Sequence, residues 1–174
     1  MEVISATTHV PQMAKIAEPA HISADSAERG REPADVYSSL EGLCHQAQEE
    51  NFQDGFDSAF SSALIKAIKL HGDAAVEALA HLIVYERISP SVASEALRWL
   101  GKMENPRTYE YRLWLLQRSL FCTSPIVRDG AALGLASLGD VRGITALKNA
   151  IERERLRELC NDMTVTLRSL QAIR

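Results

Sequence analysis

The sequence lacks the short motifs that mark most catalytic and metal-binding sites. It contains no glycine-rich phosphate loop, no nucleophile elbow and no HExxH pair. Its three cysteines, Cys44, Cys122 and Cys160, form no CxxC pair and suit no disulfide framework. Each lies among apolar residues in a helical pattern, which predicts buried packing in a reducing, cytoplasmic compartment. We therefore expect no catalytic residue, no metal and no cofactor, and classify the chain as non-enzymatic.

Long apolar runs and an excess of positive charge are also missing. No apolar run approaches the roughly 18–20 residues that cross a bilayer, so we expect no membrane partner. The first residues lack a basic segment followed by an apolar one, so we expect no signal peptide. The net charge of -4 argues against broad binding to nucleic acid, which requires Lys and Arg to neutralise phosphates.

The five histidines show no metal-ligand spacing. Cys44 and His45 are adjacent, and neighbouring residues of a helix point to different faces. An acidic group near residue 50 is best interpreted as a solvated helix end and loop rather than an ion site. Its members are Glu49, Glu50, Asp54 and Asp57.

Proline and periodicity divide the 174 residues in two. Residues 1–33 contain Pro11, Pro19 and Pro33 and no sustained pattern, which predicts a flexible N-terminal tail. Within it, residues 9–16 have the composition to order against the body or a partner. Residues 34–174 are expected to form one helical repeat domain.

Helix signals recur throughout this second part. Apolar spacing predicts helices at about 36–47, 56–70 and 73–88, with Phe56 on an apolar face, Gly72 ending one helix and Asp73 capping the next. Three later pairs, Ser89-Pro90, Asn105-Pro106 and Ser124-Pro125, place a favoured cap before a proline. They predict helices at about 91–103, 106–122, 125–138, 141–154 and 156–172. The short loops require neighbouring helices to be antiparallel.

The helices repeat. Val92, Ala96 and Leu100 occupy positions equivalent to Val127, Ala131 and Leu135. Residues 127–151, VRDGAALGLASLGDVRGITALKNAI, resemble the HEAT-repeat consensus of the phycobilisome-lyase-like kind, and the resemblance extends over about 56–172. It implies an all-α fold, a short right-handed α-α superhelix (HEAT/ARM-type solenoid) of antiparallel helical hairpins. Gly130 and Gly134 depart from the usual alanine and favour close helix approach.

One stripe is the leading candidate for binding. Leu113, Leu116 and Leu120 form the expected core face of their helix, whereas Tyr111, Trp114 and Arg118 lie on another face. In HEAT-type stacks the second helices line the concave surface, so the resemblance implies that this stripe faces a groove. We add Tyr85 and Arg142 to the candidate partner-binding residues. The alternative is that Trp114 packs against a neighbouring helix or the N-terminal segment.

The remaining large side chains have simpler interpretations. Trp99, on a first helix rich in alanine, is expected in the core. Arg98, Arg107 and Arg112 are expected to face solvent, with Arg112 a possible contact at the rim of the groove.

The leading hypothesis is an interaction module that binds a protein or peptide along the concave helices. Three alternatives remain open: an antitoxin or immunity protein, a phycobilin lyase or chaperone-like subunit, and a DNA-glycosylase-like protein. The acidic composition disfavours the last. The sequence leaves the oligomeric state open.

Overall fold

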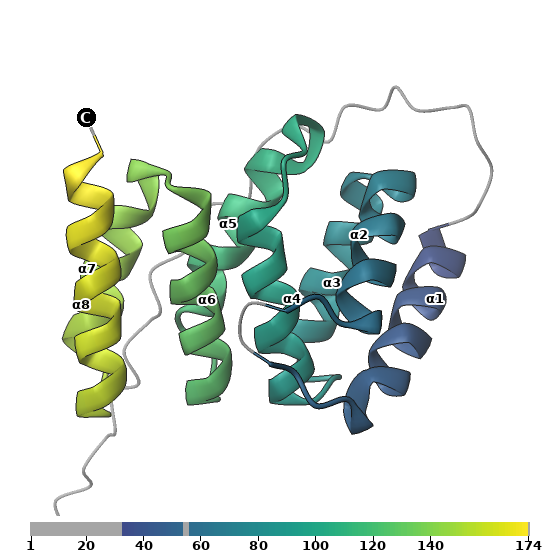
Figure 1. The fold of residues 1–174 in the computed structure, drawn as a ribbon, viewed down its shortest axis with the longest axis horizontal. Coiled ribbons are helices and arrows are strands. Elements are labelled where there is room, and N and C mark those ends of the chain that lie inside the picture. The colour runs from purple at the N-terminus through teal and green to yellow at the C-terminus, as the bar shows by residue number, and fades with distance from the viewer. Residues whose placement is uncertain (1–32, 54–55, 174) are drawn as a thin grey trace, which may run out of the picture.

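Eight α-helices and three 3₁₀ helices follow one another in the computed structural model, which describes residues 33–53 and 56–173 (Figure 1). The α-helices are α1 (Pro33–Gln46), α2 (Ala59–His71), α3 (Asp73–Val84), α4 (Pro90–Lys102), α5 (Tyr109–Ser119), α6 (Pro125–Leu138), α7 (Ile144–Arg153) and α8 (Arg157–Ala172). The 3₁₀ helices are η1 (Ala47–Glu49), η2 (Pro106–Thr108) and η3 (Val141–Gly143). No strand occurs in the described part, which confirms the all-α class. The predicted tail lies outside the described residues, except for Pro33.

Two layers of helices build the molecule. Helices α2, α4, α6 and α8 pack in succession in one layer, and α1, α3 and α5 pack in succession in the other. Helix α7 follows α5 in this second layer, because Gln117 of α5 donates a hydrogen bond of 2.9 Å to the carbonyl of Arg142 just before α7. The layers extend along the long axis of Figure 1 as an α-solenoid, which confirms the predicted architecture. We call the α1–α3–α5–α7 side the second layer.

Local signals set most helix ends. Ser58 begins α2 with a reciprocal capping box to Ser61, and Ser89 accepts a bond from the amide of Val92 ahead of α4. Gly139 ends α6 in the left-handed conformation, at a φ of 67° that glycine adopts without strain. Ser124 was predicted to cap α6, but its side chain accepts no capping bond.

Other predictions at helix ends were wrong in detail. Gly72, with a φ of 58°, separates α2 from α3, so Asp73 is the first residue of α3 and not its cap. Helix α3 ends at Val84 rather than near residue 88, because Glu86 takes a φ of 55° that no helix continues through. Phe56 precedes α2 and is 69% exposed, so it contributes nothing to the predicted apolar face.

Small residues bring α4 and α6 close together, as predicted. A Cβ added at Gly130 would lie 2.6 Å from Ser94 Cα, and one added at Gly134 would lie 2.6 Å from the Leu97 carbonyl oxygen. Ala131 between them is fully buried. Carbon atoms in contact normally lie about 3.5–4.0 Å apart, so only glycine fits at both positions. This contact positions the two hairpins relative to each other.

Arg112 was predicted to face solvent, and this prediction was wrong. It lies on α5 and is 1% exposed. Its guanidinium donates to the carbonyl oxygens of Leu100 at the end of α4, of Met103 (2.8 Å) just after it and of Asn105 (3.0 Å) in the loop that follows. Burial lowers the pKa of Arg112, yet the carbonyls of a helix C-terminus favour a cation. Arg112 therefore caps α4 from the neighbouring helix.

Trp99 also differs from its prediction. It is partly buried rather than in the core, and its Nε1 donates a 2.7 Å hydrogen bond to Glu95. The amphipathic indole thus keeps one edge at the surface.

Candidate partner-binding surface

Aromatic side chains collect on the second layer at its N-terminal end. The ring of His81 on α3 lies 5.3 Å from that of Tyr37 on α1 and 4.5 Å from that of Tyr85, just after α3. Tyr85 remains 65% exposed, and His81 is also exposed. Aromatic rings with a polar group suit a protein interface, because they supply apolar area with little conformational entropy to lose. The predicted site residue Tyr85 is therefore open to a partner.

Further along the layer, α5 carries the stripe Tyr111, Trp114 and Arg118. The rings of Tyr111 and Trp114 meet edge to face with centroids 5.4 Å apart, and both pack against the core while keeping part of their surface exposed. Nε1 of Trp114 is buried and has no acceptor among the described residues. Trp114 therefore has features of both predicted roles. Its ring packs on the core, as a structural residue does, and its indole N–H donor is left without a partner. Arg118 is partly exposed one turn further on.

Arg142 is already engaged inside the chain. Its guanidinium pairs with Asp140 at 2.7 Å and with Glu110 of α5 at 2.9 Å. Tyr109 donates a 2.8 Å hydrogen bond to Asp140. Burial alone would raise the pKa of the Asp140 carboxyl, but the bonds from Arg142 and Tyr109 lower it below its ordinary value. Arg142 therefore ties η3 to α5, and a partner that contacts it meets a cation already shared by two carboxylates.

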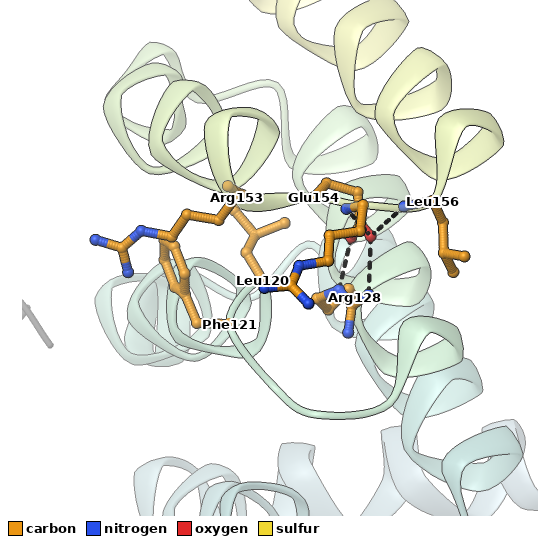
Figure 2. Close-up of a pocket in the computed structure, with 8 residues that line it drawn as sticks. Leu120, Phe121, Arg128, Arg153, Glu154 and Leu156 are labelled. Atoms are coloured by element: carbon orange, nitrogen blue, oxygen red, sulfur yellow. Dashed lines mark hydrogen bonds and ion pairs between the residues drawn. The ribbon is translucent and has the colours of Figure 1, made fainter. Parts of the chain in front are cut away.

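A pocket that sequence reasoning missed lies where the α5–α6 and α7–α8 connections meet (Figure 2). It has a volume of about 330 Å³. Its lining residues are Leu120, Phe121, Arg128, Ala150, Arg153, Glu154, Arg155 and Leu156. Phe121 lies three residues beyond Arg118, so the pocket begins where the α5 stripe ends.

A partly buried ion pair frames this pocket. Arg128 at the start of α6 binds Glu154 through two bonds of 2.7 and 3.0 Å, and it also donates to the carbonyls of Cys122 and Thr123. Glu154 in turn accepts bonds of 2.9 Å from the amides of Arg155 and Leu156. These donors, Arg128 first among them, lower the pKa of Glu154, whose side chain is only 2% exposed. The pair fixes both connections in place.

Comparison with known protein families identifies the unit beside the pocket. Residues 127–153 match the family model of the PBS lyase HEAT-like repeat. This segment is similar to a HEAT-like repeat. It comprises most of α6, all of η3 and α7, and includes Arg128, Ala150 and Arg153 of the pocket. The chain matches no curated protein and no solved structure.

The three cysteines lie outside the HEAT-like repeat and are buried or partly buried. Cys44 is fully buried, and burial raises the pKa of its thiol to about 12. Cys122 and Cys160 are partly buried rather than buried as predicted, and burial raises the pKa of the Cys122 thiol despite nearby Arg118 and Arg128. Thiols with raised pKa values are poor nucleophiles at neutral pH.

The described residues contain no cluster of His, Cys, Asp and Glu able to hold a metal, and no helix among them is long and apolar enough to cross a membrane.

Within the acidic group near residue 50, Glu49 and Asp57 are exposed as predicted, whereas Glu50 has a structural role. Glu50 accepts bonds of 2.8 and 3.2 Å from the amides of Ala59 and Phe60, at the start of α2. A carboxylate at a helix N-terminus pairs with free N–H groups and with the positive end of the helix dipole. Glu50 therefore serves the fold.

Proposed function

We propose that this protein is a non-enzymatic, cytoplasmic interaction module that binds a protein or peptide along its second layer. The observation that carries the proposal is the row of incompletely buried aromatic rings on α1, α3 and α5, which ends at Trp114 with its unused indole N–H. A HEAT-like repeat supplies successive helices at a regular spacing, which suits an extended partner.

The chemistry of Trp114 supports a binding role more than a purely structural one. A buried polar group without a partner destabilises the free protein by about 1–3 kcal/mol. Because the Trp114 ring is partly exposed, a partner that shifts the ring and places an acceptor against its N–H relieves this cost. Tyr85 offers the exposed apolar area that such an interface needs.

The test uses the full chain as bait in native extract, followed by affinity measurement with the recovered protein. Trp114→Phe keeps an aromatic ring but removes the donor, and Tyr85→Ala removes exposed area. We expect each to weaken binding by about tenfold or more, because central aromatic contacts contribute about 2 kcal/mol or more. Leu70→Ala is the matched control, since Leu70 is 73% exposed on α2 in the other layer.

Circular dichroism melting of each variant separates binding from folding. If both second-layer variants bind fully and Leu70→Ala binds more weakly, the interface lies on the α2–α4–α6–α8 layer and the proposal is contradicted. A bilin chromophore that absorbs in the purified complex would instead support the lyase-like alternative. A toxin inhibited by the chain would support the neutralising alternative.

A further inference from the structure

The pocket between the α5–α6 and α7–α8 connections is lined in nearly equal parts by apolar and by charged side chains. Leu120 and Ala150 are buried, and Phe121 is partly buried against the core. Leu156 lies on the opposite wall and is 49% exposed. The volume of about 330 Å³ is at the low end of the about 300–1,000 Å³ range of ligand sites, which suits one or two side chains.

The charges around this pocket are unbalanced. The lining contains three arginines and a single glutamate, although the whole chain has a net charge of -4. Glu154 is fully used by Arg128 and by two backbone amides. Arg153 and Arg155 therefore have no carboxylate partner among the described residues.

The geometry of Arg153 is suited to receive an anion. Its guanidinium lies 5.4 Å from the centroid of the Phe121 ring, and Figure 2 shows it beside that ring at the edge of the pocket. Stacking on an aromatic ring restrains a guanidinium while leaving its N–H groups free to donate. Both Arg153 and Arg155 are exposed, so a ligand reaches them without rearrangement of the fold.

We propose that this pocket anchors an acidic peptide segment, with one apolar side chain in the pocket and a neighbouring Asp or Glu carboxylate on Arg153 and Arg155. The charge complementarity selects the acidic residue, and the Leu120–Phe121–Leu156 walls select the apolar one. The inference rests on the proposed function in that the partner is a polypeptide, and it adds the class of segment that is bound. Because Phe121 follows the α5 stripe, the same segment can continue toward Arg118 and Trp114.

The test is a selection from a random dodecapeptide display library with the full chain as bait. We expect enriched sequences to contain an apolar residue within two positions of Asp or Glu. A synthetic version of an enriched peptide, labelled with fluorescein, is then titrated against variants. The double variant Arg153→Glu with Arg155→Glu should bind it at least tenfold more weakly, because like charges then face the carboxylate.

Two controls make the result specific. Lys66→Glu with Arg107→Glu makes the same change in net charge at exposed positions away from the pocket and should bind normally. Arg153→Gln with Arg155→Gln removes the cations without adding repulsion, and it should still weaken binding if the double Glu variant folds poorly. Replacing Asp and Glu in the peptide by Asn and Gln should have the same effect as removing the arginines.

The outcomes separate this inference from the proposed function. Peptides that require Tyr85 but neither arginine would overturn the pocket inference and leave the second-layer proposal standing. Peptides that require the arginines but not Tyr85 or Trp114 would support the pocket inference and contradict the second-layer proposal. Enrichment without acidic residues, no enrichment at all, or competition by inorganic phosphate or duplex DNA but not by the acidic peptide would each overturn the pocket inference.

Discussion

Replacing one glycine by alanine should have opposite effects in two helices of this protein. Gly130 and Gly42 both lie inside α-helices, where alanine is intrinsically favoured by about 1 kcal/mol. An added Cβ at Gly42 meets no atom within 4 Å, so Gly42→Ala should stabilise the protein by about 0.5–1 kcal/mol. At Gly130 the same atom would lie 2.6 Å from Ser94 Cα and 2.8 Å from the Ser94 carbonyl oxygen.

The steric effect at Gly130 should exceed the gain in helix propensity. The clash involves backbone atoms of α4, which cannot rotate away, so α4 and α6 must separate by roughly 1 Å and lose contact along their length. Overpacking of this kind costs about 1–3 kcal/mol, which leaves Gly130→Ala destabilised by up to about 2 kcal/mol after the gain of about 1 kcal/mol. Urea unfolding of both variants checks the sign. Equal stabilisation by the two substitutions would refute the close packing of α4 on α6.

Two further predictions concern polar groups. Arg112→Met leaves three carbonyls, at the end of α4 and in the loop after it, without their donor and should destabilise the protein by about 2–4 kcal/mol in urea unfolding. The exposed Arg107→Met should change stability by no more than about 0.5 kcal/mol. The pKa of Glu154 is lowered from its ordinary value of 4.5, so its pairing with Arg128 contributes fully above about pH 4.5 and is lost as the pH falls through the lowered pKa. The stability difference between the wild type and Arg128→Gln should therefore be constant from about pH 8 to 5 and shrink below about pH 4.5. A constant difference down to about pH 3 would show that Glu154 is not the partner.

The helix order was predictable because its signals are local. Serine or asparagine before proline, and glycine before aspartate, mark where one helix stops and the next begins, even where the side chain makes no capping bond, as at Ser124. The leucine stripe of α5 followed from the same three-four spacing, and Leu113, Leu116 and Leu120 are indeed buried.

Arg112 was not predictable in this way. Its position beside Leu113 gives no sign that its side chain reaches the end of α4, because that contact depends on how two hairpins stack. A charged residue in a helix is normally solvated, and only the unpaired carbonyls at the end of α4 and in the loop after it make burial favourable here.

The pocket was missed for a related reason. Its residues come from four connected elements that periodicity treats separately, and the charge run at 152–157 reads as an exposed turn. The usable signal was Leu156 within that run, together with Phe121 at the end of the α5 stripe. Neither becomes meaningful until α6 and α8 are packed side by side.

Hydrogen exchange of the full chain, with and without its partner, tests the central claim most directly. A partner on the second layer should slow amide exchange in the residues around Tyr85 and in the stretch from Trp114 to Phe121, with further protection at 153–156 if the pocket is filled. Protection restricted to α2, α4, α6 and α8, with the stretches around Tyr85 and Trp114 unchanged, would contradict the account.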